Sequence, residues 1–359
     1  MGNGMAEQLV SSSRLGALRS ALGNGAKPVL LVIHDYPDPD AIASALAIQT
    51  LAGAWGVSAI IVQGGGVGRA GNAEMIRLLK IDLRTFASIP DLGEYAGAVF
   101  LDTQPQARNQ SLPDYVPVLA VIDHHDISSA STRLSRRSSE TGKTVYSDVR
   151  SNVGASSTLA FGYLDAAGIV PDARLATALF LGIKTDTDSL LRNASPGDIG
   201  AYVALLPLAD IQLAAQVIHP PQNREYYVFM HQAAERSTVY GSTLLANLGD
   251  ISSQDMLSEA SDYLINFKGM RYALAVGFKD ARVFMSLRAK PSHADATAVL
   301  LHVLEPEGKG GGHGLSAGGF IDGFDDREAA IGLIRDRLLE ATGDIGSVGE
   351  HLIPEELVR

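Results

Sequence analysis

The chain has 359 residues, of which 46% are apolar and 19% charged, so it can bury a core, and its length favours two domains of roughly 100–200 residues each. Its formal charge of −11 at pH 7 argues against a protein that coats long nucleic acid or an anionic membrane, because such proteins are basic. The absence of cysteine excludes disulfides, thiolate zinc sites and cysteine nucleophiles, so any metal ion must be held by His, Asp and Glu.

The predicted location is the cytoplasm. The N-terminal residues lack the basic-then-apolar pattern of a secretory signal. Polar side chains interrupt the longest apolar stretch, residues 41–57, before it reaches the length of about 18 residues that a transmembrane helix needs. The sequence therefore predicts no membrane partner.

The first half of the chain alternates between strand-like and helix-like segments. Short apolar runs predict buried strands at residues 27–33, 57–62, 96–101 and 116–122. Helical spacing of apolar residues predicts helices at residues 40–55, 72–80, 154–167 and 172–183. This alternation predicts an α/β fold with a parallel sheet and helices on both faces, in which functional groups gather past the carboxyl ends of the strands.

The second half has a different pattern. A mostly helical stretch over residues 196–234 is broken by prolines and reads as a connector. The segments that follow are predicted as a strand at 238–246, a helix at 256–267, a hairpin of 272–278 with 283–287, a helix at 294–304, a glycine-rich loop at 309–319 and a closing helix at 327–342. The predicted division is a catalytic domain over residues 1–215, a helical linker over 216–240 and a smaller α+β domain over 241–359.

One imidazole and two carboxylates lie at the end of the first predicted strand. This strand runs into the sequence HDYPDPDA, which places His34, Asp38 and Asp40 within seven residues on a turn stiffened by prolines. Asp40 could also cap the following helix, but capping accounts for only one of the three polar groups. Imidazole and carboxylate ligands at such a turn favour a divalent ion such as Mn²⁺ or Mg²⁺.

Three further acidic motifs follow predicted elements. Asp102 ends the strand VFLDT, and the strand VIDHHD ends in Asp123, His124 and His125. Asp186 stands in GIKTDT after an apolar helix. A single Asp at a strand end is often only a cap, but two tandem histidines beside aspartates, in a chain with nine histidines, are poorly explained by packing.

These motifs are predicted to meet at one edge of the sheet, where they offer enough ligands for two divalent ions with one bridging carboxylate. The candidate ligands are His34, Asp38, Asp40, Asp102, His124 and Asp186. Two such ions form a clamp for in-line displacement at phosphorus.

The ordered motifs HDYPDPDA, VFLDT, VIDHHD and GIKTDT resemble the four motifs of the DHH phosphoesterase superfamily. The later sequence KGGGHGLSAGG resembles the glycine–histidine loop of the associated DHHA1 domain. The resemblance covers residues 27–325, and its order and spacing are similar to the two-domain subfamily of oligoribonucleases (nano-RNases) and pAp phosphatases. This subfamily also includes phosphodiesterases of cyclic and linear dinucleotides.

The resemblance implies two metal ions between the domains, Mn²⁺ first and Mg²⁺ as the alternative. It assigns His34 and Asp38 to the first ion and Asp40, His124 and Asp186 to the second, with Asp102 bridging. Asp123 would orient a ligand, and His125 would face the substrate phosphate and donate a proton to the leaving oxygen. The residues implied to hold the substrate's far end are Arg288, Gly311, Gly312 and His313.

The implied activity is hydrolysis of short oligoribonucleotides to mononucleotides, of 3′-phosphoadenosine 5′-phosphate (pAp), or of both, by attack of a metal-bridging hydroxide. The first alternative is a phosphodiesterase of cyclic di-AMP or linear pApA. A single-strand exonuclease and an inorganic pyrophosphatase fit less well, and a non-catalytic nucleotide sensor remains an alternative of another class. The expected partners are short oligonucleotides or nucleotides, without long-duplex binding, and a homodimer is compatible with the sequence. Asp188 and Lys290 depart from the family pattern and leave substrate choice open.

Three other features have simpler interpretations. Residues 66–71 match the dinucleotide-binding pattern GxGxxG, but they follow the second predicted strand rather than the first, so we interpret them as a glycine loop. Arg133, Arg136 and Arg137 are interpreted as a solvated basic cluster, with contact to substrate phosphates as the alternative. Tyr226 and Tyr227 are interpreted as packing residues, although one ring could stack on a base.

Overall fold

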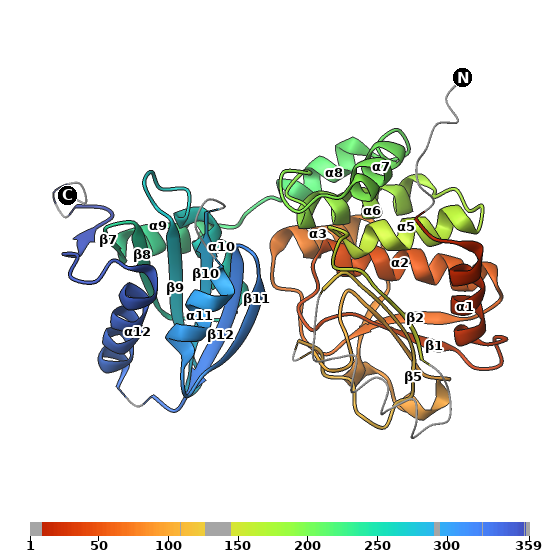
Figure 1. Cartoon of the computed structure of the whole chain (residues 1–359), viewed down its shortest axis with the longest axis horizontal. Coiled ribbons are helices and arrows are strands. Elements are labelled where there is room, and N and C mark those ends of the chain that lie inside the picture. The colour runs from red at the N-terminus through yellow and green to blue at the C-terminus, as the bar shows by residue number, and fades with distance from the viewer. Residues whose placement is uncertain are drawn as a thin grey trace. The chain divides into compact units, whose positions relative to one another are not determined.

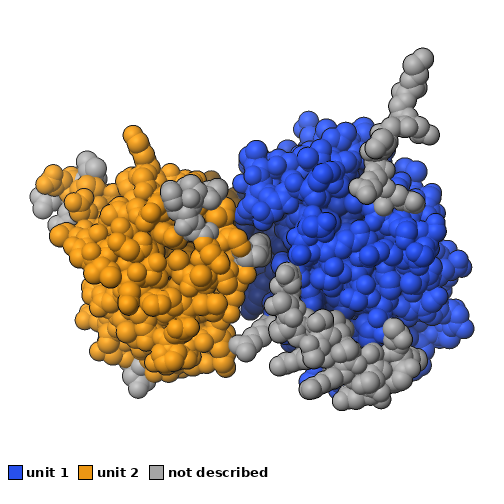
Figure 2. All heavy atoms as spheres, in the orientation of Figure 1, with its two compact units in different colours: residues 1–221 blue, residues 222–359 orange. Residues whose placement is uncertain are grey.

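The structure is a computed structural model. It describes residues 9–107, 109–125, 145–290, 295–324, 326–354 and 356. The chain divides into two compact units, residues 1–221 and residues 222–359 (Figure 2). Among the described residues, no helix combines the length and apolar character needed to cross a membrane.

The first unit is built on a six-stranded parallel sheet with the strand order β3-β2-β1-β4-β5-β6. Its strands are β1 (Val29–Val32), β2 (Ala59–Gln63), β3 (Leu83–Thr85), β4 (Ala98–Leu101), β5 (Val118–Asp123) and β6 (Tyr146–Val149). The central strands β1 and β4 are buried at every position, which explains why they read as continuous apolar runs. The strand order reverses between β1 and β4, and in open α/β sheets the ligand site lies at this reversal, past the carboxyl ends of the strands.

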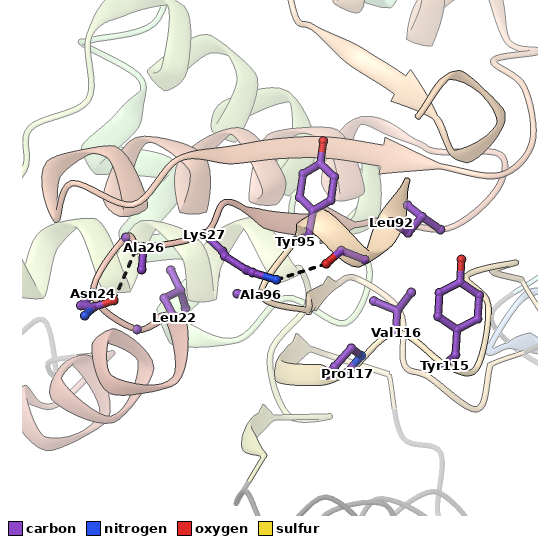
Figure 3. A pocket seen from close by; sticks show the side chains of 13 residues that line it. Leu22, Asn24, Ala26, Lys27, Leu92, Tyr95, Ala96, Tyr115, Val116 and Pro117 are labelled. Atoms are coloured by element: carbon purple, nitrogen blue, oxygen red, sulfur yellow. Dashed lines mark hydrogen bonds between the residues drawn. The ribbon is translucent and has the colours of Figure 1, made fainter. Parts of the chain in front are cut away.

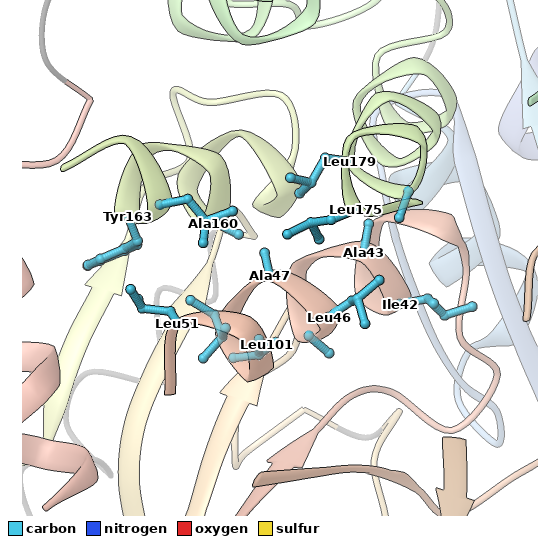
Figure 4. Packing of buried hydrophobic residues seen from close by; sticks show 14 of the residues in the cluster. Ile42, Ala43, Leu46, Ala47, Leu51, Leu101, Ala160, Tyr163, Leu175 and Leu179 are labelled. Atoms are coloured by element: carbon cyan, nitrogen blue, oxygen red, sulfur yellow. The ribbon is translucent and has the colours of Figure 1, made fainter. Parts of the chain in front are cut away.

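α-Helices cover one face of this sheet. They are α1 (Ser12–Leu22), α2 (Pro39–Ala54), α3 (Ala70–Leu78), α5 (Ser156–Ala166), α6 (Ala173–Asp186), α7 (Pro196–Leu205) and α8 (Ile211–Ile218). Helix α2 lies between the strands and the pair α5 and α6 (Figure 1). Twelve of its sixteen residues are buried, so it packs on all sides rather than along one stripe. Its small residues Ala43 and Ala47 allow α6 and α5 to approach closely (Figure 4).

The other face of the sheet packs against short segments. Phe100 and Val121 on this face contact a cluster that includes Leu92, Leu112 and Val116. Among the described residues, the helices over this face are the 3-10 helices η1 (Phe86–Ser88) and η2 (Leu92–Glu94). The predicted α/β fold, with a parallel sheet and helices on both faces, is confirmed, and the described helices on the second face are the short 3-10 helices η1 and η2.

The second unit contains a seven-stranded sheet with the order β11-β12-β10-β9-β8-β7-β13. Among its described strands, β8 and β9 pair in parallel and the other neighbours pair antiparallel. Its strands are β7 (Ser237–Tyr240), β8 (Thr243–Asp250), β9 (Tyr272–Lys279), β10 (Arg282–Ala289), β11 (Lys309–His313), β12 (Ser316–Asp322) and β13 (Glu350–His351). Its helices are α9 (Arg224–Glu235), α10 (Asp255–Leu264), α11 (Ala296–Leu304) and α12 (Arg327–Thr342). The predicted α+β character of this part is confirmed.

Two predictions in the second unit were wrong in detail. The single strand expected at residues 238–246 is the hairpin β7–β8, which turns at Gly241 with φ +60°. The glycine-rich loop expected at residues 309–319 is the hairpin β11–β12. Glycine is a poor strand former, but here its missing side chain permits close packing, since a Cβ at Gly310 would lie 2.4 Å from Leu304 Cδ1 and 2.8 Å from Gly318 O.

Candidate metal centre

The carboxyl ends of β1, β4 and β5 bring the predicted ligands together. His34 follows β1, Asp102 follows β4, and Asp123 is the last residue of β5. Because β1 and β4 are neighbours, His34 and Asp102 lie on the two sides of the strand-order reversal. His34 Nε2 is 3.7 Å from Asp102 Oδ2.

One group of side chains able to hold a metal ion consists of Asp40, Asp102, His124 and Asp186. His124 Nε2 lies 3.1 Å from Asp186 Oδ2 and 3.3 Å from Asp102 Oδ1. Asp186 is the last residue of α6, so this helix delivers its carboxylate to the strand ends.

A second group consists of His34, Asp38 and Asp102. His34 Nε2 lies 3.8 Å from Asp38 Oδ1 as well as near Asp102. Asp102, with His124 and His125, forms a third group. Asp102 belongs to all three, so its position is the one from which a carboxylate could bridge two ions.

The imidazole of His124 fits a metal ligand better than a hydrogen-bond donor. Its Nε2 is buried, faces two carboxylate oxygens and makes no hydrogen bond to any described group. Its Nδ1 lies 3.3 Å from Val153 O, and such a contact on the other ring nitrogen is typical of histidines that bind metals through Nε2. A divalent ion among these atoms would satisfy Nε2 and both carboxylates.

The helices that Asp38 and Asp40 cap differ from the capping that the sequence suggested. Asp38, not Asp40, caps α2, because its Oδ1 accepts from Asp40 N and Ala41 N at 3.0 Å each. Asp40 caps a distant helix instead: its two oxygens accept from Ser156 N and Ser157 N of α5 at 2.7 Å each. Each Asp40 oxygen keeps a second lone pair, so capping and metal binding are compatible.

Gln104 is a buried residue of the site that sequence reasoning missed. Its Nε2 donates to Asp123 Oδ2 at 2.8 Å and to His125 O at 2.9 Å. Asp123 Oδ1 in turn lies 2.9 Å from His125 Nδ1 and accepts from His124 N at 2.8 Å. Gln104 and Asp123 therefore fix the orientation of the His-His pair, and the only sequence signal was the position of Gln104 two residues after Asp102.

Charge crowding shifts the acid–base equilibria of the site. Burial, followed by the charge of Asp102, raises the pKa of Asp40 well above its usual range. Burial, followed by the charge of Asp38, raises the pKa of Asp186 to about 6. Burial acts to lower the pKa of His34, but hydrogen bonding and charge from Asp38 outweigh it and raise this pKa to about 9. The clustered carboxylates thus require positive charge, which a divalent ion would supply.

The backbone of Asp102 has φ +56°, in the left-handed region. Among non-glycine residues, Asp and Asn adopt this conformation most readily. Asp102 is the residue that the three groups share. Its backbone conformation turns the chain out of β4 and directs the carboxylate towards His34 and His124.

The second unit holds the other predicted site residues. Arg288 on β10 is ion-paired with Asp262 of α10, and its Nη1 donates to Ser286 Oγ at 3.1 Å. In the strand register, Ser286 stands opposite Gly318, which stands opposite Gly311. A Cβ at Gly311 would meet nothing within 4 Å, so this row leaves backbone accessible beside Ser286. Gly312 is packed against β12, and the side chain of His313 lies outside the described part.

The remaining sequence features are not part of these groups. Arg133, Arg136 and Arg137 lie outside the described residues. The glycine pattern at residues 66–71 leads into α3, as expected for a loop between strand and helix. Tyr226 and Tyr227 lie on α9 with ring centroids 5.7 Å apart, and Tyr227 is exposed.

A hollow of about 450 Å³ lies at the opposite edge of the first sheet, before the amino ends of β1, β4 and β5. Lys27, Tyr95 and Tyr115 are among its lining residues, and Lys27 Nζ donates to Gly93 O at 3.3 Å (Figure 3). None of the grouped His and Asp residues lines it, so the hollow is separate from the candidate metal centre.

No family model matches the chain. The uncharacterized protein MJ1633 of Methanocaldococcus jannaschii is 34% identical over 327 residues, which cover 88% of this chain and 64% of that protein, so the chain spans less than two thirds of this curated relative. An exopolyphosphatase-related protein from Bacteroides fragilis superposes with a TM-score of 0.73 at 14% identity, covering 93% of this chain and 97% of that one. RecJ from Thermus thermophilus, solved with Mn²⁺, superposes with a TM-score of 0.54 at 12% identity, covering 95% of this chain and 55% of that one. The two solved structures are under 25% identical to this chain, and they establish a shared fold.

Proposed function

We propose that the chain is a Mn²⁺-dependent phosphohydrolase that cleaves short oligoribonucleotides to mononucleotides and dephosphorylates pAp. The observation that carries this proposal is the pair of His and Asp groups that share Asp102 at the strand-order reversal. Two ions held about 3.5–4 Å apart by such groups are typical of enzymes that transfer phosphoryl groups by in-line displacement. The Mn²⁺ in the RecJ structure of the same fold supports manganese.

In the first unit, the candidate residues would serve as ligands of two metal ions. His34 and Asp38 would hold one ion, Asp40, His124 and Asp186 would hold the other, and Asp102 is the carboxylate that both groups share. Bound divalent ions supply a Lewis acid and lower the pKa of water at the site.

His125 would donate a proton to the leaving oxygen as the bond between that oxygen and phosphorus breaks. The water oxygen would bond to phosphorus, and the proton that the water loses would pass to solvent. Asp123 holds the His125 ring through Nδ1, and Gln104 holds Asp123, so the ring keeps one orientation during this transfer.

The second unit would bind the far end of the substrate. Arg288 offers a guanidinium for a terminal phosphate, with Asp262 fixing its orientation. Gly311 and Gly318, which lie beside the buried Ser286 in the strand register, offer accessible backbone for a nucleotide.

The test is a rate comparison with the Mn²⁺-loaded protein on a 5′-labelled diribonucleotide, pAp, pApA and cyclic di-AMP. We expect mononucleotide release from the diribonucleotide and phosphate release from pAp. Faster turnover of pApA or cyclic di-AMP would identify a dinucleotide phosphodiesterase instead. If none of the four is hydrolysed, the proposed activity is wrong and a nucleotide sensor becomes the better interpretation.

The matched control is Asp102→Asn. Asn tolerates φ +56° and preserves the shape of the side chain, so the backbone should be retained while the shared negative charge is lost. We expect turnover to fall by more than about 10²-fold. Turnover that survives in this variant would show that the three groups are not the catalytic centre.

A further inference from the structure

We propose that Arg192 contacts a non-bridging oxygen of the substrate phosphate at the metal centre, an inference that rests on the proposed function. Sequence reasoning gave this residue no role. It lies six residues after Asp186, the ligand that ends α6, on the segment 187–193.

The segment has an unusual backbone. Asp188, Ser189 and Leu190 have φ of +49°, +60° and +69°. Three successive non-glycine residues in the left-handed region are rare, because the Cβ atom is crowded there. Such strain persists where the surrounding structure enforces it, and it concentrates at functional sites.

Two sets of contacts enforce this backbone. Ser189 N donates to Lys184 O at 2.7 Å, and Arg192 N donates to Thr187 O at 2.8 Å, which folds the segment back onto the end of α6. The two ends of the segment, Thr187 and Asn193, pack against Gly154. A Cβ atom built at Gly154 would lie 2.8 Å from Thr187 Cγ2 and 2.9 Å from Asn193 O. The strained segment is therefore held in one conformation beside the N-terminus of α5.

This conformation places a guanidinium beside the last metal ligand. Arg192 Nη2 donates to Asp186 O at 3.3 Å, and the side chain is half-buried. Several carboxylates crowd the neighbouring groups, yet Arg192 forms an ion pair with none of those in the described ranges. One backbone contact uses only one of the five N–H donors of a guanidinium, so the cation keeps donors for an anion.

The chemistry of phosphoryl transfer explains what such a cation would do. Negative charge accumulates on the non-bridging oxygens when a nucleophile attacks phosphorus, and a guanidinium fork fits two oxygens of one phosphate. Because its position is fixed in advance, Arg192 would stabilise this charge without reorganisation. The simpler alternative is that Arg192 only satisfies the C-terminal carbonyls of α6.

Two variants separate these interpretations. Arg192→Met removes the charge and the donors while keeping the length, and Arg192→Lys keeps the charge but loses the fork. The control is Arg174→Met, because Arg174 also donates to backbone carbonyls, Leu79 O and Lys80 O, and is outside the metal groups. For each full-length variant we would measure kcat/KM on the diribonucleotide and calorimetric binding of Mn²⁺ alone. Binding of inorganic phosphate to the Mn²⁺-loaded protein is the third measurement.

For Arg192→Met we expect kcat/KM to fall by about 10²–10³-fold and phosphate binding to weaken by about tenfold or more, with Mn²⁺ affinity and thermal stability altered no more than in Arg174→Met. Arg192→Lys should recover part of both losses. Unchanged phosphate binding in Arg192→Met would overturn the inference and leave Arg192 as a helix cap. Phosphate binding is measured without turnover, so a wild-type protein that hydrolyses nothing would refute the proposed function and still test Arg192.

Discussion

Asp148 is a fully buried carboxylate that ties the N-terminal helix to the edge of the first sheet. Arg14 of α1 pairs with its Oδ1, and Arg150 Nε donates to the same oxygen at 2.7 Å. Tyr163 of α5 donates to Oδ2 at 2.7 Å. Burial acts to raise the pKa of Asp148, but the contacts with Arg150 and Tyr163 outweigh it and lower the pKa. Two arginines thus compensate its charge, and a tyrosine hydroxyl from α5 binds its other oxygen.

We predict that Asp148→Asn lowers the free energy of unfolding by about 1–3 kcal/mol at pH 7, because it leaves the donors of the half-buried Arg150 and the buried Tyr163 without their charged acceptor. The folded-state pKa of Asp148 lies below its unfolded value of about 3.9, so its contribution is present above about pH 4 and is lost as the pH falls through the folded-state pKa. Chemical denaturation of both proteins between about pH 7 and about pH 3 should therefore show the difference shrinking below about pH 4.

The control for this prediction is Asp82→Asn. Asp82 pairs with Arg84, but both side chains are exposed, so the ion pair contributes little to stability. A loss in Asp82→Asn as large as in Asp148→Asn would indicate a general charge effect. A difference for Asp148→Asn that stays constant across the acidic range would contradict the pKa argument.

At the scale of elements, the packing of α6 on α2 and α5 depends on Gly182. A Cβ at this position would lie 2.2 Å from Ser157 Oγ and 3.1 Å from the Asp40 Cα and Oδ1 atoms. The backbone amide of Ser157 is one of the two donors that hold the Asp40 carboxylate. The close approach of these helices therefore positions a candidate ligand.

We expect Gly182→Ala to lower the free energy of unfolding by about 1–3 kcal/mol through overpacking, and to weaken Mn²⁺ binding because Asp40 shifts. The matched control is Gly200→Ala in α7, where a Cβ meets nothing within 4 Å and should stabilise the helix by up to about 1 kcal/mol. Thermal denaturation and calorimetric Mn²⁺ titration measure both effects. If the two variants behaved alike, the close packing around Gly182 would be irrelevant to the site.

The glycines of β11 allow structural and functional roles to be separated. A Cβ at Gly312 would lie 2.3 Å from Ser316 O, whereas a Cβ at Gly311 would be unobstructed. We expect Gly312→Ala to destabilise the hairpin, and Gly311→Ala to leave the melting temperature unchanged but raise KM for the diribonucleotide. If Gly311→Ala had the KM of the wild type, this row of the sheet would not be in contact with substrate.

How well the sequence predicted each element depended on where its stabilising contacts lie. The strands β1 and β4 and the ligands that follow them were predictable, because burial on both faces produces an apolar run that ends at the first polar residue. Helix α1 and strand β6 were not expected: α1 buries only Leu18 and Leu22, and β6 is a short, half-exposed edge strand. The capping of α5 by Asp40 joins residues 116 positions apart, and no local pattern reports such a contact.

At the scale of the whole molecule, the two units have separate cores. The main core of the first unit joins the helices to one face of the parallel sheet, and Leu92 and Phe100 belong to its second cluster. In the second unit, one cluster includes Leu274 and Leu300, and another includes Leu257 and Ala275. All grouped metal-ligand candidates belong to the first unit. Ligand binding stabilises only the structure that contains the binding site, so metal ions should act on the two units unequally.

We therefore predict two calorimetric unfolding transitions in the full-length protein, of which Mn²⁺ raises only one. A free Mn²⁺ concentration about 1,000 times Kd should stabilise the first unit by about 4 kcal/mol. For a unit of this size, that stabilisation corresponds to a rise in melting temperature of about 10 °C, which EDTA should reverse. Leu300→Ala, in the core of the second unit, identifies the other transition by lowering it alone. Asp102→Asn should abolish the rise in melting temperature caused by Mn²⁺, because Asp102 belongs to every group of candidate ligands. Equal shifts of both transitions, or a full shift in Asp102→Asn, would place the ions elsewhere.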